Sequence, residues 1–212
     1  KKIKFKAHRV IDFAWFADKR FMVNYQPLEV NDTTIELWAF FYAQNKGVWA
    51  QATHYTAQAV KYFNSLVGDY PYPQVTVVEC PRMGSDAMEY PMITLIDQYY
   101  GQPLELEKVI VHEIGHNWFQ SILATDERTQ AWMDEGLVTY YEHRYFNNKQ
   151  QHGIFSDAPI PLHTDYDLVP DFDWYIQANR NQDKPSGGRA DNYTIREYIQ
   201  SIYEKPAKGL KL

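Results

Sequence analysis

The decapeptide Val111 to Gln120 reads Val-His-Glu-Ile-Gly-His-Asn-Trp-Phe-Gln. It contains the pattern His112-Glu113-x-x-His116, in which two histidines stand four residues apart. On a helix this spacing places both imidazoles on one face, where they can bind a single Zn²⁺ ion. The alternative is an ordinary amphipathic helix with surface histidines, because three fixed positions also match by chance.

The residue types in this motif are suited to hydrolysis. Neutral imidazole is a good zinc ligand, and a catalytic zinc keeps one position open for a water whose pKa falls from about 15.7 to about 7. A carboxylate beside that water, here Glu113, can accept the proton and later pass it to a leaving amine.

Composition limits the possible functions. The 212 residues are 45% hydrophobic and 16% aromatic, which is typical of a globular protein. A net charge of −6 argues against nucleic-acid binding, since phosphate-binding domains usually carry a basic face. Cys80 is the only cysteine, so any metal must be bound by histidine and carboxylate. No apolar run approaches the roughly 20 residues of a membrane span.

Hydrophobic periodicity predicts strands in the first half of the chain and helices around the motif. Alternating residues predict strands within Lys1–Val23, and runs of β-branched and aromatic residues predict strands at 33–41, 75–79 and 92–96. Apolar residues three to four apart predict a helix over about 50–67, and the motif helix is expected over 104–123, followed by another over about 132–146. Residues 150–192 are interpreted as turns and loops, with a last helix at 207–212. Because the chain opens in a strand-like pattern and ends within a helix, we expect a fragment of a longer protein.

A third metal ligand is expected on the helix that follows the motif. A metzincin would have Gly and then His at the positions of Phe119 and Ile122, so that class is excluded. Glu135 follows His116 after 18 residues, and a turn between two antiparallel helices can bring it back to the metal. Glu127 lies in the polar link and is interpreted as solvated.

Four motifs resemble those of the M1 family of zinc aminopeptidases, which are gluzincins, and they follow one another along the chain in the family's order. The zinc-binding pattern is similar to His112-Glu113-Ile114-Gly115-His116-Asn117-Trp118-Phe119 followed by Trp132-Met133-Asp134-Glu135-Gly136. The family's Gly-x-Met-Glu-Asn exopeptidase motif resembles Asp86-Ala87-Met88-Glu89-Tyr90, in which Asp86 and Tyr90 depart from the pattern. Its catalytic tyrosine motif resembles Tyr203-Glu204-Lys205, here followed by Pro206 where many relatives have Gly. The motifs span more than half of the chain.

The resemblance implies an α/β (α+β) fold: a thermolysin-like zinc peptidase catalytic domain, with a mixed sheet followed by a mainly helical part. Residues 1–25 would be the end of an N-terminal β domain, and residues 26–212 the catalytic domain, truncated at its C-terminus. Further N- and C-terminal domains of the same protein would be missing.

The resemblance also implies the metal site and the base. His112, His116 and Glu135 would hold one Zn²⁺ ion per chain, and Glu113 would act as general base and then as general acid.

The substrate implied is a peptide with a free N-terminus. Glu89, with Met88 and Ala87, would bind the substrate, and the Glu89 carboxylate would take the α-amino group. Tyr203 would donate a hydrogen bond to the oxyanion, with Tyr198 and Tyr193 as alternatives for this role. The function implied is removal of N-terminal residues, and the rivals are a zinc endopeptidase and a catalytically silent peptide-binding relative.

Overall fold

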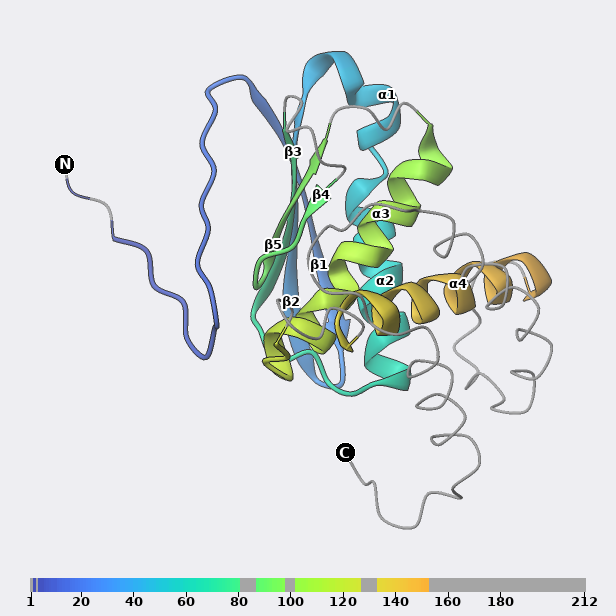
Figure 1. Cartoon of the computed structure of the whole chain (residues 1–212). Helices are drawn as coiled ribbons and strands as arrows, with labels where there is room; N and C mark the ends of the chain where they lie inside the picture. The colour runs from blue at the N-terminus through green and yellow to red at the C-terminus, as the bar shows by residue number, and fades with distance from the viewer. Residues whose placement is uncertain (1, 3, 81–86, 98–101, 127–132, 153–212) are drawn as a thin grey trace, which may run out of the picture. The chain divides into compact units, whose positions relative to one another are not determined.

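The structure is a computed structural model that describes residues 2, 4–80, 87–97, 102–126 and 133–152 (Figure 1). The chain divides into two compact units, Lys1–Ala124 and Thr125–Leu212. The predicted helix at 207–212 and the loops predicted after residue 152 lie outside the described residues.

A five-stranded mixed sheet forms the centre of the first unit, with strand order β1-β2-β3-β5-β4. The strands are β1 (Phe21–Val30), β2 (Thr33–Tyr42), β3 (Gln74–Cys80), β4 (Ala87–Met88) and β5 (Ile93–Asp97). The β1–β2 and β4–β5 pairs are antiparallel, whereas β2–β3 and β3–β5 are parallel. The predicted mixed sheet is confirmed, as are the strands predicted at 33–41, 75–79 and 92–96.

The turn between β1 and β2 fixes the register of the first hairpin. Asn31 and Asp32 have φ values of 47° and 59°, and a two-residue type I′ turn requires positive φ at both positions. Asn and Asp tolerate this conformation better than most residues do. Val30 and Thr33 are therefore directly paired at the end of the hairpin.

Pro27 lies in the middle of β1, opposite Glu36. The Glu36 amide donates to the carbonyl of Pro73 at 2.9 Å, so the backbone of Glu36 is directed away from β1. The two residues therefore form a non-hydrogen-bonded pair, and the nitrogen of Pro27 lies on the free edge of the sheet. This position accommodates a proline without loss of a ladder hydrogen bond.

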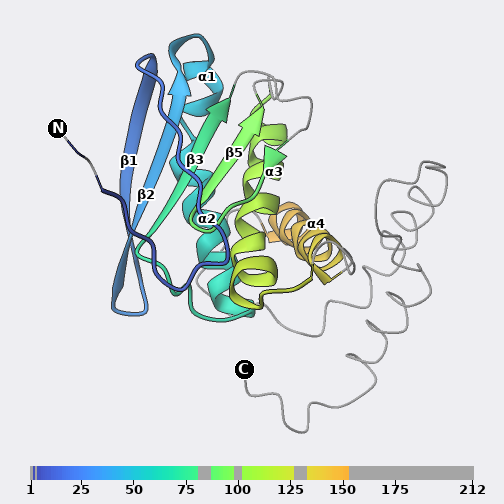
Figure 2. The same cartoon turned by 60° about the vertical axis from the view of Figure 1, so that its left-hand side comes forward.

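The strands predicted before Phe21 are wrong, since none of the described residues in that segment is in a strand. The segment is extended and runs along one face of the sheet (Figure 2). Phe16 packs there against the buried residues Val78, Cys80 and Leu95. Phe16 thus packs on the sheet without a partner strand, whereas Phe5, Phe13 and Trp15 of the same segment are exposed. The domain boundary predicted at residue 25 falls inside β1 and stays a prediction.

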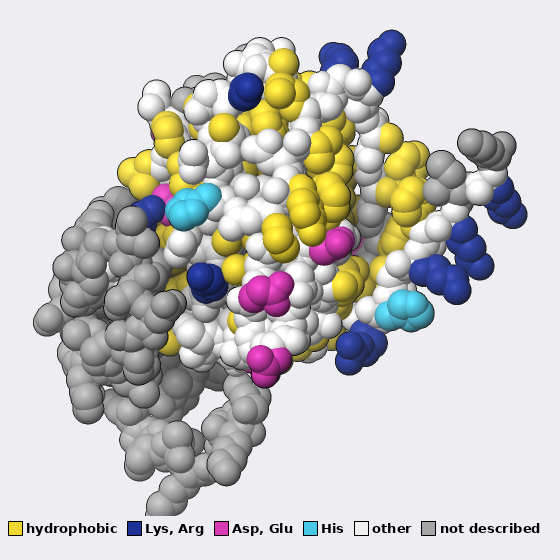
Figure 3. All heavy atoms as spheres, turned by 180° about the vertical axis from the view of Figure 1, so that it is seen from behind, with side chains coloured by type: hydrophobic (Ala, Val, Ile, Leu, Met, Phe, Trp, Pro, Cys, Tyr) yellow, Lys and Arg dark blue, Asp and Glu magenta, His cyan; other side chains and the backbone are white. Residues whose placement is uncertain are grey.

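Part of the N-terminal segment is exposed to solvent. Phe5 and Trp15 in the N-terminal segment are each 68% exposed. Figure 3 shows Lys and Arg side chains along the N-terminal segment.

Helices cover the opposite face of the sheet (Figures 1 and 2). The chain forms a short 3-10 turn, η1 (Ala43–Asn45), then α1 (Lys46–Trp49) and α2 (Ala52–Leu66), and after the sheet α3 (Pro103–His116). A π-helical segment, η2 (Asn117–Ile122), continues α3. The predicted helices over about 50–67 and 104–123 are confirmed. No helix in the described ranges is long and apolar enough to cross a membrane.

The second unit contains α4 (Glu135–His152). The helix predicted over about 132–146 is confirmed, although it extends further than expected. Val138 and Tyr145 are fully buried.

Candidate metal centre and active site

The helix α3 carries the two histidines of the central motif. Pro103 lies in its first turn, where a backbone N–H has no partner within the helix. The negative charge of Glu105 in the same turn interacts favourably with the positive end of the helix dipole. The residues that anchor the helix in the core are all fully buried and recur at a helical spacing: Leu106, Ile110 and Ile114.

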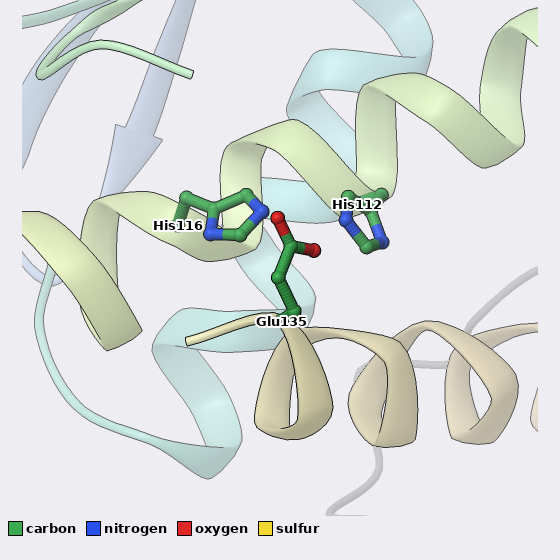
Figure 4. A group of neighbouring side chains, drawn as sticks. All are labelled: His112, His116 and Glu135. Carbon is green, nitrogen blue, oxygen red and sulfur yellow. The ribbon is translucent and has the colours of Figure 1, made fainter. Parts of the chain in front are cut away.

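His112 and His116 lie one turn apart on another face of α3. Their ring centroids are 5.0 Å apart, and Figure 4 shows both imidazoles extending from the same side of the helix. His116 is 1% exposed and His112 is half-buried. The structure thus brings together the two histidines that the four-residue spacing paired.

Glu113 lies between the histidines in sequence and is 7% exposed. Its Oε2 atom lies 3.4 Å from the Thr94 hydroxyl on β5. The same hydroxyl lies 3.1 Å from the carbonyl oxygen of Met88. Thr94 therefore lies between the Glu113 carboxylate and the end of β4, which precedes Glu89. Its one hydroxyl hydrogen can be donated to only one of these two acceptors at a time.

Ala87 and Met88 form β4, the edge strand at the other end of the sheet from β1. They pair with Ile96 and Leu95 of β5. Glu89 follows directly and is half-buried. The prediction that this segment lies on or beside a strand edge is confirmed.

Glu135 is the first residue of α4, in the second unit, and is exposed. Tyr203 and its alternatives Tyr198 and Tyr193 lie outside the described residues, as does Asp86.

Sequence reasoning missed Thr94 as a residue of this region. A threonine in a buried strand is ordinarily interpreted as a strand former, so its type gave no signal. Its position beside Glu113 of the motif helix became evident only from the structure.

Two imidazoles and a neighbouring acid can support metal-assisted hydrolysis. Neutral imidazole nitrogen binds zinc at about 2.0–2.1 Å, and three protein ligands leave a position for water. A carboxylate next to that position, such as Glu113, can move a proton between water and a leaving group.

The chain is similar in sequence to curated aminopeptidases. The chain is 34% identical over 109 residues to endoplasmic reticulum aminopeptidase 2 of Bos taurus, a match that covers 44% of this chain and 11% of that protein. It is 26% identical over 129 residues to aminopeptidase Q of Acinonyx jubatus, a match that covers 54% of this chain and 13% of that protein. The chain therefore spans only a small part of the length of the curated relatives it matches.

The fold is also similar to that of a solved structure, an M1 zinc metallopeptidase from Deinococcus radiodurans. The TM-score is 0.57 at 18% sequence identity, and the match covers 86% of this chain and 38% of that chain. Identity at this level supports the fold alone.

The family comparison covers the motif helix, β4 and the whole of α4. The model of the peptidase family M1 domain matches residues 51–166, more than half of the chain. On this match, the chain belongs to peptidase family M1.

Proposed function

We propose that this chain is the catalytic part of a zinc aminopeptidase that removes N-terminal residues from peptides. The observation that carries the proposal is the pair His112 and His116 on one face of α3, with the buried Glu113 between them in sequence, inside the matched family domain. The curated relatives named above are aminopeptidases, which supports exopeptidase over endopeptidase activity.

We propose His112, His116 and Glu135 as the ligands of one zinc ion (Figure 4). Each residue offers one ligand atom, and two imidazoles with one carboxylate form a donor set that suits catalytic zinc. Glu89, His116 and Asp134 form a second group of possible metal ligands. The first set is favoured because it uses both histidines of the pair and leaves Glu89 available for substrate.

The protein groups divide the reaction between them. Zinc, when bound, lowers the pKa of a water and polarises the scissile carbonyl. The Glu113 carboxylate accepts a proton from the attacking water and returns it to the nitrogen of the leaving peptide. The Thr94 hydroxyl lies 3.4 Å from Oε2 of Glu113 and can donate to this carboxylate when it does not donate to the nearer carbonyl of Met88. Tyr203 is proposed to stabilise the oxyanion by donating a hydrogen bond.

Glu89 is proposed to select the free amino terminus. A carboxylate beside the site attracts a cationic α-amino group and restricts cleavage to the first peptide bond. If so, Glu89→Ala should mainly raise KM for a free peptide. Glu36→Ala is the matched control, because Glu36 is an exposed glutamate on β2, which β3 and β5 separate from β4.

The test compares a peptide with its N-acetylated twin, using the full-length protein after its zinc content has been measured. We expect cleavage of the free peptide to be much faster. Equal rates for the two peptides would indicate an endopeptidase. Zinc-free protein with no hydrolysis of either peptide would support the catalytically silent relative.

A further inference from the structure

Asn117, the residue directly after His116, is 3% exposed and bonds to two other parts of the first unit. Its Oδ1 atom accepts the backbone N–H of Met92 at 2.9 Å, and its Nδ2 atom donates to the carbonyl of Ile114 at 3.1 Å. The orientation of the carboxamide is unambiguous, because a backbone N–H only donates and a carbonyl only accepts. The hydroxyl of Tyr70 lies farther from Oδ1, at 3.4 Å.

The bond to Met92 fixes a strained point of the backbone. Met92 has a φ of 67°, a left-handed conformation that residues with a side chain seldom adopt. Such a conformation persists only when its surroundings determine it. Here the amide of Met92 is held by Asn117, and its carbonyl accepts the amide of Thr76 at 2.8 Å.

The fixed Met92 in turn holds the segment that contains Glu89. The Ile93 amide donates to the carbonyl of Tyr90 at 3.1 Å, closing a turn over Pro91 and Met92. On the other side of Glu89, the carbonyl of Met88 is 3.1 Å from the Thr94 hydroxyl. The backbone of Glu89 is therefore held on both sides, once through β5 and once through the end of the motif helix.

We propose that Asn117 is a positioning residue that sets the distance between Glu89 and the motif helix, and thereby the preference for a free amino terminus. The inference rests on the proposed function. In any peptide, the α-amino group and the first carbonyl are separated by a fixed covalent distance. A carboxylate that binds the amine must therefore be placed accurately relative to the histidines and Glu113, and a displacement of about 1 Å can lower the rate by roughly a hundredfold.

Two variants separate the hydrogen bond from the volume of the side chain. Asn117→Leu has a similar size and removes both hydrogen bonds. Asn117→Asp keeps an acceptor for the Met92 amide. Asn64→Ala is the matched control, because Asn64 accepts the Tyr70 amide at the same distance, 2.9 Å, at the link between α2 and β3.

Kinetics of the full-length, zinc-loaded protein give the first measurement. For a free peptide we expect Asn117→Leu to raise KM by roughly tenfold or more, with a smaller change in kcat. The ratio of kcat/KM for the free peptide to that for its N-acetylated twin should fall. Asn117→Asp should recover most of the ratio, and Asn64→Ala should match the wild type.

Hydrogen exchange of the Met92 amide gives a second measurement that does not depend on activity. Exchange should be faster in Asn117→Leu than in the wild type, and close to the wild-type rate in Asn117→Asp and Asn64→Ala. If Asn117→Leu does not fold, Asn117→Ser replaces it, because serine is too short to reach the Met92 amide.

The outcomes distinguish this inference from the function on which it rests. An unchanged selectivity ratio in Asn117→Leu, an equal loss for both peptides, or loss of bound zinc would overturn the inference. A wild-type protein that does not prefer the free peptide would overturn the aminopeptidase proposal, and with it the selectivity part of the inference. Met92 exchange would then still report whether Asn117 holds the segment.

Discussion

The indole nitrogen of Trp118 donates a 2.8 Å hydrogen bond to the backbone carbonyl of Gly68. Gly68 follows the end of α2 and has a φ of 146°. The Trp118 ring is 3% exposed and stacks on Phe63 of α2, with ring centroids 5.3 Å apart. The π-helical segment after the histidine pair is thus joined to α2 by a polar and an apolar contact through one side chain.

Trp118→Phe should therefore destabilise the protein. Phenylalanine retains part of the ring packing but leaves the Gly68 carbonyl without this donor, and such a loss typically costs about 1–3 kcal/mol. The free energy of unfolding from urea denaturation measures the effect. Trp15→Phe is the control, because Trp15 is 68% exposed and should change stability little. Equal effects of the two substitutions would contradict the role assigned to this bond.

Zinc content should depend on both histidines of α3. His112→Ala and His116→Ala should each lower bound zinc strongly at a free zinc concentration that saturates the wild type, because each removes one of the three proposed ligands. His54→Ala, an exposed histidine on α2, is the control and should retain zinc. Asp134→Ala distinguishes the two ligand sets. Loss of zinc in Asp134→Ala with retention in His112→Ala would favour the set of Glu89, His116 and Asp134.

Glu113→Gln should lower kcat by about 10²–10⁴-fold while zinc content is retained, because the amide cannot accept the proton of the attacking water. Glu105→Gln, an exposed position in the first turn of the same helix, is the control. A Glu113→Gln variant with wild-type kcat would show that another group acts as the base.

Cys80 should be unreactive toward thiol reagents in the folded protein. Its side chain is 6% exposed, and burial, with smaller effects of Asp97 and Glu79, raises the pKa of the thiol to about 11. The thiolate is the reactive form, so modification at pH 8 should be slow until urea unfolds the chain. As Cys80 is the only cysteine, all reagent uptake reports on it. Rapid modification without urea would contradict the burial.

The same shift gives a direction for stability at high pH. The folded state favours the neutral thiol, so its contribution to stability is complete below the unfolded pKa of about 9 and is lost as the pH rises toward about 11. Cys80→Ala should reduce this loss between pH 9 and 11, as measured by urea denaturation.

Two local patterns predicted most of the elements. The helices α2 and α3 follow from the spacing of their apolar residues, and the strands β2, β3 and β5 follow from runs of β-branched and aromatic residues. The segment before Phe21 was assigned wrongly, because alternation describes any extended chain with one side on an apolar surface. The continuation of β1 past Val23 was not predicted. Proline is compatible with an edge strand, but the sequence does not identify which strand lies at the edge.

The histidine pair of the candidate site was predictable because it depends on a local helical period. Thr94 and Asn117 were not, because their contacts depend on which strand and which turn lie beside the motif helix. Asn117 lies inside the motif stretch, but no local sequence pattern indicates which residue a carboxamide after His116 will bind. The left-handed Met92 that it binds is also invisible in sequence, since no glycine stands there.

Pro27 bears on how copies of this chain behave toward one another. The outer edge of β1 exposes a row of backbone donors and acceptors, to which a strand of another molecule can add. Pro27 removes one donor from the middle of that row. Together with a net charge of −6, it opposes edge-to-edge aggregation through this hairpin. Pro27 therefore helps to keep the sheet from extending into a neighbouring molecule.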